Sequence, residues 1–169
     1  MSTPIASLHT LDFVPRPSEH VATDAATAAR FDASRTALGK ALGLSKLGVN
    51  VTAVKAGKAA YPFHSHRAND ELFLILAGRG ELRLGGQRLA VKEGDLIGCP
   101  AGDASTAHQL VNTGEAELRY LAVSTLIDPE VCEYPDSGKI GAYCGGGGGD
   151  KGLMHLSRSA DATDYWAGE

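Results

Sequence analysis

Apolar and polar residues alternate with a period of two through the middle of the chain. The alternation begins at Gly48 with Val49, Val51 and Val54. Six further segments are each bounded by Gly, Pro or Asn, and each predicts a short strand: Glu71–Ala77, Glu81–Leu84, Gln87–Val91, Asp95–Cys99, Ala107–Asn112 and Leu118–Thr125. Short strands at close spacing are typical of an antiparallel sandwich or barrel. We therefore expect an all-β domain.

Two local patterns refine this prediction. Gly85-Gly86, between Leu84 and Gln87, predicts a two-residue hairpin turn, because glycine adopts positive φ without steric cost. The run Leu72–Leu76 is apolar on both faces, which differs from the alternation of a half-exposed strand. We expect its outer face to be covered by the N-terminal arm, the C-terminal tail or another subunit. This run is the main sequence argument for a homodimer.

The segments that flank the predicted barrel carry less periodicity. Residues 1–47 are expected to form an arm that packs on the barrel or on a partner, and residues 48–127 the barrel itself. Within the arm, Ala22–Ala33 permits a short helix with Thr23 or Asp24 as its N-cap. After Asp128-Pro129 the strand pattern is lost, so residues 128–169 are expected to form an extension.

The extension contains three recognisable features. Gly145–Gly149 predicts a flexible loop, and Leu153, Met154 and Leu156 predict a short strand after it. The single tryptophan lies near the end, in Tyr165-Trp166. A large aromatic side chain in a terminal segment is typical of a docking anchor.

Composition excludes several classes of protein. The 169 residues are 43% hydrophobic and 21% charged, which suits a soluble globular domain. With 20 acidic and 16 basic residues and no basic run, nucleic acid is not an expected partner. The longest strongly apolar run is far too short to span a bilayer, and Met1–Pro15 does not resemble a signal peptide. The three cysteines have no metal-binding or disulfide spacing, so we expect a cytoplasmic protein.

Four residues form the strongest candidate site: His64, His66, Glu71 and His108. In a strand, His64 and His66 point to the same face because they are two positions apart. Glu71 shares its parity with Phe73 and Ile75, so it is expected to face inward, where a carboxylate without a partner is costly. Three imidazoles and a carboxylate can bind one divalent cation and leave coordination positions open. The residues therefore predict a metal site.

The same residues resemble the two motifs of the cupin superfamily. The first motif is matched by Gly57, His64-Ser65-His66, Glu71 and Gly78, with one extra residue before His64. The second is matched by Gly94, Pro100-Ala101-Gly102, His108 and Asn112, with three extra residues within Asp103–Ala107. The chain is also similar to small bacterial cupins that end in Tyr-Trp-x-Gly-Glu.

This resemblance implies an antiparallel double-stranded β-helix, the jelly-roll barrel of cupins, with an N-terminal arm and a C-terminal tail. It implies one divalent transition metal, Fe, Mn, Ni or Zn, held by His64, His66, Glu71 and His108. Similar cupins include dioxygenases, sugar-phosphate isomerases, lyases and non-catalytic modules that bind sugars or organic acids.

We favour a metal-dependent enzyme acting on a small organic molecule, because packing alone does not require a four-ligand set. Oxygen-dependent chemistry is narrowly preferred over a sugar isomerase, since the barrel arginines are spread out and form no phosphate site. A non-catalytic binding module is the alternative.

Other polar residues are weaker candidates, and none is assigned a catalytic role. Cys99 is expected to face the barrel interior, as a small buried apolar residue or as a neighbour of the metal. His155 is expected at the surface. The residues that flank the proposed ligands and can offer a proton or a hydrogen bond are Tyr61, Arg67, Asp70 and Gln109.

Overall fold

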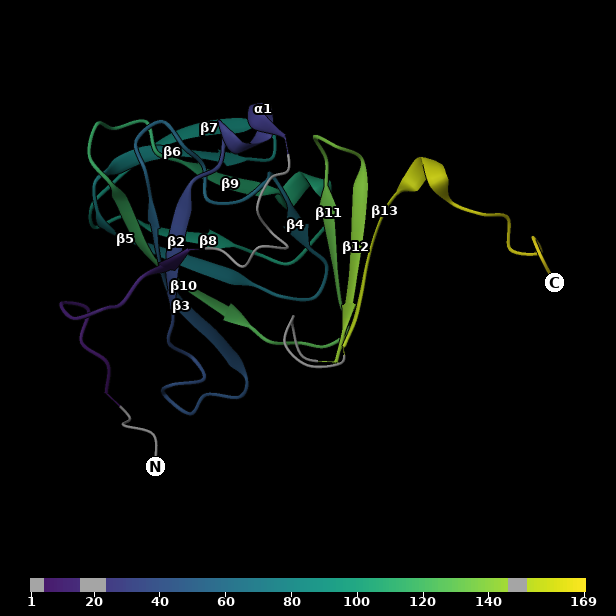
Figure 1. Ribbon diagram of the computed structural model, residues 1–169, viewed down its shortest axis with the longest axis horizontal. Helices are drawn as coiled ribbons and strands as arrows, with labels where there is room; N and C mark the ends of the chain where they lie inside the picture. Colours follow the sequence, from purple (N-terminus) through teal and green to yellow (C-terminus); the bar gives the residue numbers. More distant parts are fainter. Residues whose placement is uncertain (1–4, 16–23, 146–151) are drawn as a thin grey trace.

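The computed structural model describes residues 5–15, 24–145 and 152–169 of the chain, and its strands form three antiparallel sheets (Figure 1). The strands of the largest sheet are β1 (Val14–Pro15), β2 (Ala33–Ala37), β3 (Leu47–Val54), β5 (Glu71–Ala77), β8 (Leu96–Cys99) and β10 (Leu118–Thr125). Their order in this sheet is β1-β2-β3-β10-β5-β8. Pairing between strands far apart in sequence makes this an antiparallel double-stranded β-helix, so the predicted fold class is confirmed.

A smaller sheet closes the other side of the barrel. It consists of β6 (Arg79–Leu84), β7 (Gln87–Lys92) and β9 (His108–Val111), in the order β7-β6-β9. The predicted hairpin joins β6 to β7: Leu84 pairs with Gln87, and Gly85 has a φ of 52°. A side chain at Gly85 would also meet the carbonyl oxygen of Ser105, at 2.6 Å from its Cβ. Glycine is therefore needed there for both conformation and space.

The hydrophobic core lies between these two sheets. Alternate residues of the strands point inward and are almost completely buried, as the period-two pattern predicts. The buried cluster consists of Val54, Ala60, Phe73, Ile75, Leu82, Val91, Ile97, Cys99, Leu110, Leu118, Tyr120 and Ala122. Cys99 faces this interior, as expected from its parity with Ile97.

The third sheet stands beside the barrel and corrects the prediction for the C-terminal extension. Its strands are β4 (Ser65–His66), β11 (Glu130–Tyr134), β12 (Lys139–Cys144) and β13 (Leu153–Arg158), in the order β13-β12-β11-β4. The expectation that strand structure ends after Asp128 is wrong, although the strand predicted around Leu153–Leu156 is present. The sequence does contain a signal for β11 and β12, since Pro135-Asp136-Ser137-Gly138 is a turn between two runs of strand-forming residues.

The N-terminal segment also differs from its prediction. The helix α1 spans only Ala25–Ala28, with Asp24 as its N-cap, because the Asp24 carboxylate accepts a hydrogen bond from the Thr27 amide at 2.8 Å. The expected helix over Ala22–Ala33 is therefore too long, and residues 22–23 lie outside the described residues. Its last residue begins β2, which pairs with β3 and extends the large sheet. Alanine propensity favoured the helix, but pairing with an exposed sheet edge determines the structure.

Apart from α1, the helical elements among the described residues are single turns. They are the 3₁₀ helices η2 (Ala104–Thr106) and η3 (Ser159–Asp161). The helix η2 lies within Asp103–Ala107, the segment that contains the three extra residues before His108. The Asp103 carboxylate caps it by accepting a hydrogen bond from the Ser105 amide at 2.8 Å. Among the described residues, no helix has the length and hydrophobicity needed to cross a lipid bilayer. Most of Gly145–Gly149, the predicted loop, lies outside the described residues.

The buried side chain of Asn112 connects three backbone segments. Its Nδ2 donates to the carbonyl oxygens of Val54 and Ala116, each at 2.8 Å, and its Oδ1 accepts from the Gly114 amide at 2.9 Å. The residue is completely buried. Its amide therefore satisfies polar backbone groups that water does not reach.

We predict that Asn112→Ala lowers the free energy of unfolding by about 3 kcal/mol, because buried carbonyl and amide groups lose their partners. The exposed neighbour Thr113 provides the control, and Thr113→Ala should change stability by less than about 0.5 kcal/mol. Urea unfolding followed by circular dichroism measures both. Equal stability of the two variants would contradict the assigned role of Asn112.

Candidate metal centre

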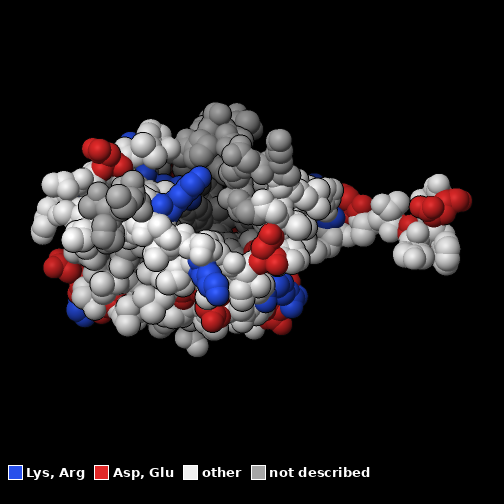
Figure 2. Space-filling model, turned by 90° about the horizontal axis from the view of Figure 1, so that it is seen from below, with Lys and Arg blue, Asp and Glu red and all other residues white. Residues whose placement is uncertain are grey.

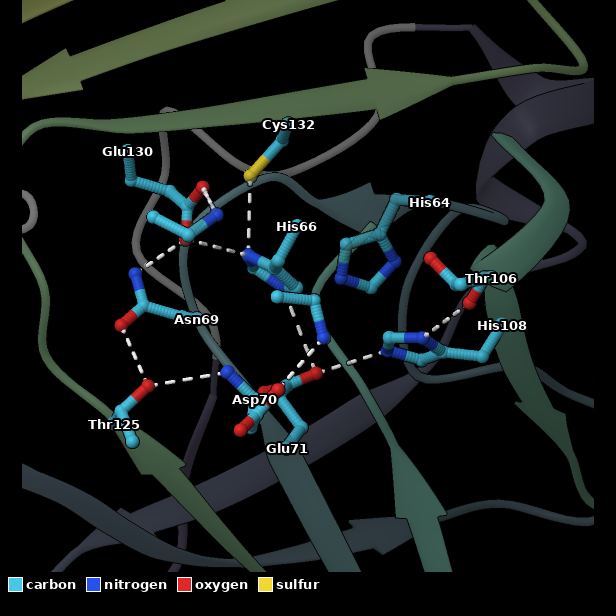
Figure 3. Close-up of polar contacts among 12 residues, drawn as sticks. His64, His66, Asn69, Asp70, Glu71, Thr106, His108, Thr125, Glu130 and Cys132 are labelled. Carbon is cyan, nitrogen blue, oxygen red and sulfur yellow. Dashed lines mark hydrogen bonds and ion pairs between the residues drawn. The ribbon is translucent and has the colours of Figure 1, made fainter. Parts of the chain in front are cut away.

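The structure brings the four predicted residues together at one end of the barrel interior (Figure 3). One ligand atom from each of His64, His66, Glu71 and His108 lies within 4.8 Å of all the others. Glu71 is the first residue of β5. Its carboxylate oxygen Oε2 lies 2.9 Å from His108 Nε2 and 3.5 Å from His66 Nε2. The centres of the His64 and His66 rings are 4.9 Å apart, as are those of His64 and His108. The four side chains thus converge as the motif resemblance implies.

Backbone pairing holds the two histidine-bearing segments side by side. His64 and His108 form an isolated antiparallel bridge. The His64 amide donates to the His108 carbonyl at 3.2 Å, and the His108 amide donates to the His64 carbonyl at 2.8 Å. At β4, Ser65 and His66 then pair with β11. His64 and His108, which are more than forty positions apart in the sequence, are therefore held side by side by this antiparallel bridge.

The other nitrogen of each ring has its own partner. His64 Nδ1 lies 2.8 Å from the Pro62 carbonyl, and His108 Nδ1 lies 3.4 Å from the Thr106 carbonyl. For His64, donation from Nδ1 to a carbonyl leaves Nε2 with a free lone pair, whereas His108 Nε2 faces the Glu71 carboxylate, at 2.9 Å from its Oε2. For His66, Nδ1 faces Cys132 Sγ at 3.3 Å and Glu130 Oε2 at 3.4 Å. Such outer partners orient metal-binding imidazoles.

The strand β11 contributes a second row of side chains that sequence reasoning missed. Glu130, Cys132 and Tyr134 alternate along it and therefore share one face. Glu130 and Cys132 contact His66, and the Tyr134 ring lies nearly parallel to the His64 ring, at 6.0 Å and 18°. The Tyr134 hydroxyl forms a 2.9 Å hydrogen bond with the Tyr143 hydroxyl on β12. One phenol and one thiol thus lie beside the histidines, and a second phenol is hydrogen-bonded to the first.

Glu130 also shapes the loop between His66 and Glu71. Its Oε1 accepts from the backbone amides of Arg67 and Ala68, each at 3.0 Å. Its Oε2 accepts from Asn69, whose amide group also bonds to Thr125 and Ile127. The buried Asn69 therefore links this loop to the ends of β10 and β11. Through these bonds the C-terminal sheet sets the spacing between two proposed ligands.

The weaker candidates have structural partners. Gln109 donates to the Tyr61 carbonyl at 2.7 Å, and the Asp70 carboxylate accepts from the Ala101 amide at 2.7 Å. Arg67 forms an ion pair with Glu133. Tyr61 remains close to the site, with its ring centre 6.3 Å from that of His64. His155 is exposed on β13, as expected.

Burial and mutual contact shift the pKa values of the cluster in opposite directions. Burial, together with the charges of His108 and His66, lowers the pKa of His64 to about 4. Burial also disfavours the charged form of His66, but its contacts with Cys132 and Glu71 outweigh this and raise its pKa to about 10. Burial opposes ionisation of Glu71, yet hydrogen bonds from His108 and His66 hold its pKa well below the usual range. The carboxylate is therefore charged.

The donor set fits a divalent first-row transition metal. Imidazole nitrogens and a carboxylate oxygen are accepted by Zn, Fe, Ni and Mn ions, and four such ligands leave coordination positions for a small molecule. Burial of an ionised carboxylate with neighbouring imidazoles is the expected environment for a bound cation. The cluster is thus capable of binding a metal, although its chemistry does not select which one.

The fold and this cluster define a small β-barrel protein with a potential metal centre in its interior. Residues 50–124 match the cupin domain family. The chain is a member of the cupin superfamily. This confirms the resemblance inferred from the two motifs.

Part of the chain is similar to an oxalate-binding protein from Thermotoga maritima, with 33% identity over 64 residues, which are 38% of this chain and 50% of that protein. The matches span about half the length of the curated relatives. They therefore concern part of the chain and not the whole of it.

Two solved structures are similar over a longer part of the chain. A sugar phosphate isomerase of the cupin superfamily from Silicibacter pomeroyi is 25% identical, with a TM-score of 0.77 over 94% of this chain and 95% of that one. A protein from Acidithiobacillus ferrooxidans, provisionally named a sugar phosphate isomerase, is 26% identical, with a TM-score of 0.69 over 79% of this chain and 80% of that one. The first likeness includes segments on both sides of the cupin domain.

We predict that metal-free protein loses stability as the pH rises from about 6.5 to about 8.5. His66 keeps its proton in the folded state, with a pKa near 10, whereas an unfolded histidine releases it near 6.5. The contribution of His66 is therefore fully present below pH 6.5 and declines above it, by at most about 1.4 kcal/mol per pH unit. Urea unfolding with a chelator present measures this decline, and His66→Gln should flatten it. A decline that is unchanged in the variant would contradict the assigned protonation.

Proposed function

We propose that this protein is a metal-dependent enzyme that acts on a small organic molecule. The observation that carries the proposal is the convergence of four ligand atoms within 4.8 Å, in a buried site made from three different strands and the loop before β4. Packing does not require three imidazoles around a carboxylate, because apolar side chains would fill the same space at lower cost in desolvation. His64, His66, Glu71 and His108 are the proposed ligands.

A divalent cation held here supplies a Lewis acid that polarises an oxygen atom of the bound molecule. The protein's own residues determine what else happens to that molecule. Glu71, charged and buried, balances the cation, and the outer contacts of the three imidazoles fix their orientation. A small molecule with hydroxyl, carbonyl or carboxylate oxygens suits such a site.

Tyr134 and Tyr143 are the proposed proton-transfer groups. Burial is the main cause that raises the pKa of Tyr134 above that of a free phenol, and its hydrogen bond with Tyr143 adds to the effect. Tyr134 therefore stays protonated and can donate a proton. The ring of Tyr134 lies beside His64, and Tyr143 connects it to the next strand. An enzyme needs such a group beside its metal, whereas a simple binding module does not. This pair is the structural argument for catalysis.

Oxygen-dependent oxidation is the reaction that we put first. A phosphate-bearing substrate requires an unpaired cation, and two arginines close to the site are already paired. Arg67 contacts Glu133, and the two terminal guanidinium nitrogens of Arg83 donate to the Asp136 carboxylate, at 2.6 and 2.7 Å. An uncharged or carboxylate-bearing substrate therefore fits these surroundings better than a phosphate ester.

Isomerisation of a sugar is the second candidate reaction. The long structural likeness to the sugar phosphate isomerase from Silicibacter pomeroyi favours it. Isomerisation of a hydroxy-carbonyl compound moves protons between neighbouring carbon and oxygen atoms, which the tyrosine pair and Glu71 are placed to support. The paired arginines favour a free sugar over a phosphorylated one.

We predict that the protein binds about one equivalent of a divalent transition metal, and that His64→Ala and His108→Ala each reduce this at least about tenfold. The protein is purified without a histidine tag, incubated with Fe(II), Mn(II), Ni(II) or Zn(II), desalted and analysed for elements. His155→Ala is the matched control, because this histidine is exposed and distant in the fold from the cluster. Less than about a tenth of an equivalent in unmodified protein would contradict the metal site.

We predict that metal-loaded protein turns over at least one member of a panel of small diols, keto acids, thiols and free sugars. Oxygen consumption and product masses separate the two candidate reactions, since isomerisation consumes no oxygen. Tyr134→Phe should lower kcat by about 100-fold or more while metal content is retained. Tight ligand binding by metal-loaded protein without any product would instead support the non-catalytic binding module.

A further inference from the structure

The outer face of the large sheet carries an uncovered apolar hollow. Gly98, Leu72 and Val123 lie in register across β8, β5 and β10, and Leu47 lies near them at the start of β3. The hollow has a volume of about 390 Å³. It exists because Gly98 has no side chain, and an added Cβ there would meet nothing within 4 Å. Leu72 and Leu96 are 38% and 65% exposed.

The described residues of the arm and the tail leave this hollow open. The N-terminal segment adds β1 and β2 to the opposite edge of the sheet, beyond β3. The C-terminal tail leads away from the barrel after β13 (Figure 1). The sequence predicted that the arm, the tail or another subunit covers the apolar run Leu72–Leu76. Because the described residues of the arm and the tail do not cover it, another subunit is the covering that we infer.

Residues 159–169, the part of the C-terminal tail that follows β13, form the C-terminal arm. The tip of this arm is apolar and exposed. Tyr165 and Trp166 are 83% and 73% exposed, and their rings are in edge contact, with centres 4.8 Å apart. The Asp164 carboxylate accepts from the Trp166 amide at 2.9 Å, and the Ala167 amide donates to the Asp164 carbonyl at 3.1 Å. A tight turn thus presents the aromatic pair. A preformed turn lowers the entropy cost of binding.

We propose that two copies of this chain form a dimer by exchanging C-terminal arms, with Tyr165 and Trp166 of each copy inserted into the hollow beside Leu72 of the other. The arm stands clear of its own barrel, with acidic side chains near its end (Figure 2). One chain therefore carries both an apolar projection and an apolar hollow, and a two-fold axis satisfies both at once.

The area involved is sufficient for a specific dimer. A buried tyrosine or tryptophan removes about 150–250 Å² from water, so two arms contribute about 600–1000 Å² before the surface of the two hollows is counted. With that surface included, the total reaches the range of about 1200–2000 Å² that specific interfaces bury. The exchange also covers β8, which is one of the two edge strands of the large sheet among the described residues.

The proposal is tested by the oligomeric state of the full chain. Light scattering after size exclusion should show a dimer, and Trp166→Ala or Leu72→Asp should raise its dissociation constant at least about thirtyfold. Gly98→Leu, which fills the hollow without adding charge, should do the same. The matched controls are Thr163→Ala in the arm and Leu89→Asp, an equally exposed leucine on the other sheet. Both control variants should remain dimeric.

A mixing experiment distinguishes arm exchange from direct pairing of two sheet faces. A Trp166→Ala protomer keeps its hollow, and a Leu72→Asp protomer keeps its arm, so an equimolar mixture should form a heterodimer with one intact contact. Native mass spectrometry resolves the two protomers. A monomeric unmodified chain at about 100 µM would overturn the proposal. It would also be overturned by a dimer that survives both substitutions, or by a mixture that stays monomeric.

Discussion

The half-buried carboxylate of Glu71 is the constraint on which the rest of the site depends. It lies on the inward face of β5, in line with Phe73 and Ile75, where an ionised group without partners costs several kcal/mol. The imidazoles of His66 and His108 are its partners. They come from segments that reach β5 only when the barrel closes and when His64 pairs with His108. Closure of the fold and assembly of the site are therefore one event.

The same constraint extends to the C-terminal sheet. The loop that separates His66 from Glu71 has no regular structure, and its shape depends on Asn69 and on the Glu130 carboxylate. Glu130 is available only because β11 pairs with β4. A strand beyond the cupin domain thus determines how far apart two proposed ligands lie. The extension is structurally part of the site.

Sequence reasoning predicted the barrel strands well because most of their inward-facing residues are apolar. The predicted bounds of β5 and β10 are those of the structure. The predicted β6–β7 hairpin is also present, although β6 begins two residues earlier than expected, at Arg79, and β7 ends one residue later, at Lys92. It failed for β11, whose inward row is Glu130, Cys132 and Tyr134, because a polar site face removes the apolar signal. It failed for β2 for a different reason: Ala33–Ala37 has no strand propensity of its own and is a strand only because β3 offers it an edge. The proposed ligands were found from their motif spacing, while their outer contacts depend on tertiary pairing that spacing does not encode.

The proposed metal ligands and the proposed proton-transfer groups lie in different parts of the chain. The ligand residues lie within residues 50–124, which are the part shared with the cupin family in general. Three residues near the site lie outside this range. Cys132 and Tyr134 contact the histidines, and Tyr143 is hydrogen-bonded to Tyr134. A match confined to residues 50–124 therefore covers the proposed metal ligands but not the proposed proton-transfer groups. Structures that also match in the C-terminal sheet are the informative comparison for the reaction, because the proposed proton-transfer groups Tyr134 and Tyr143 lie on that sheet.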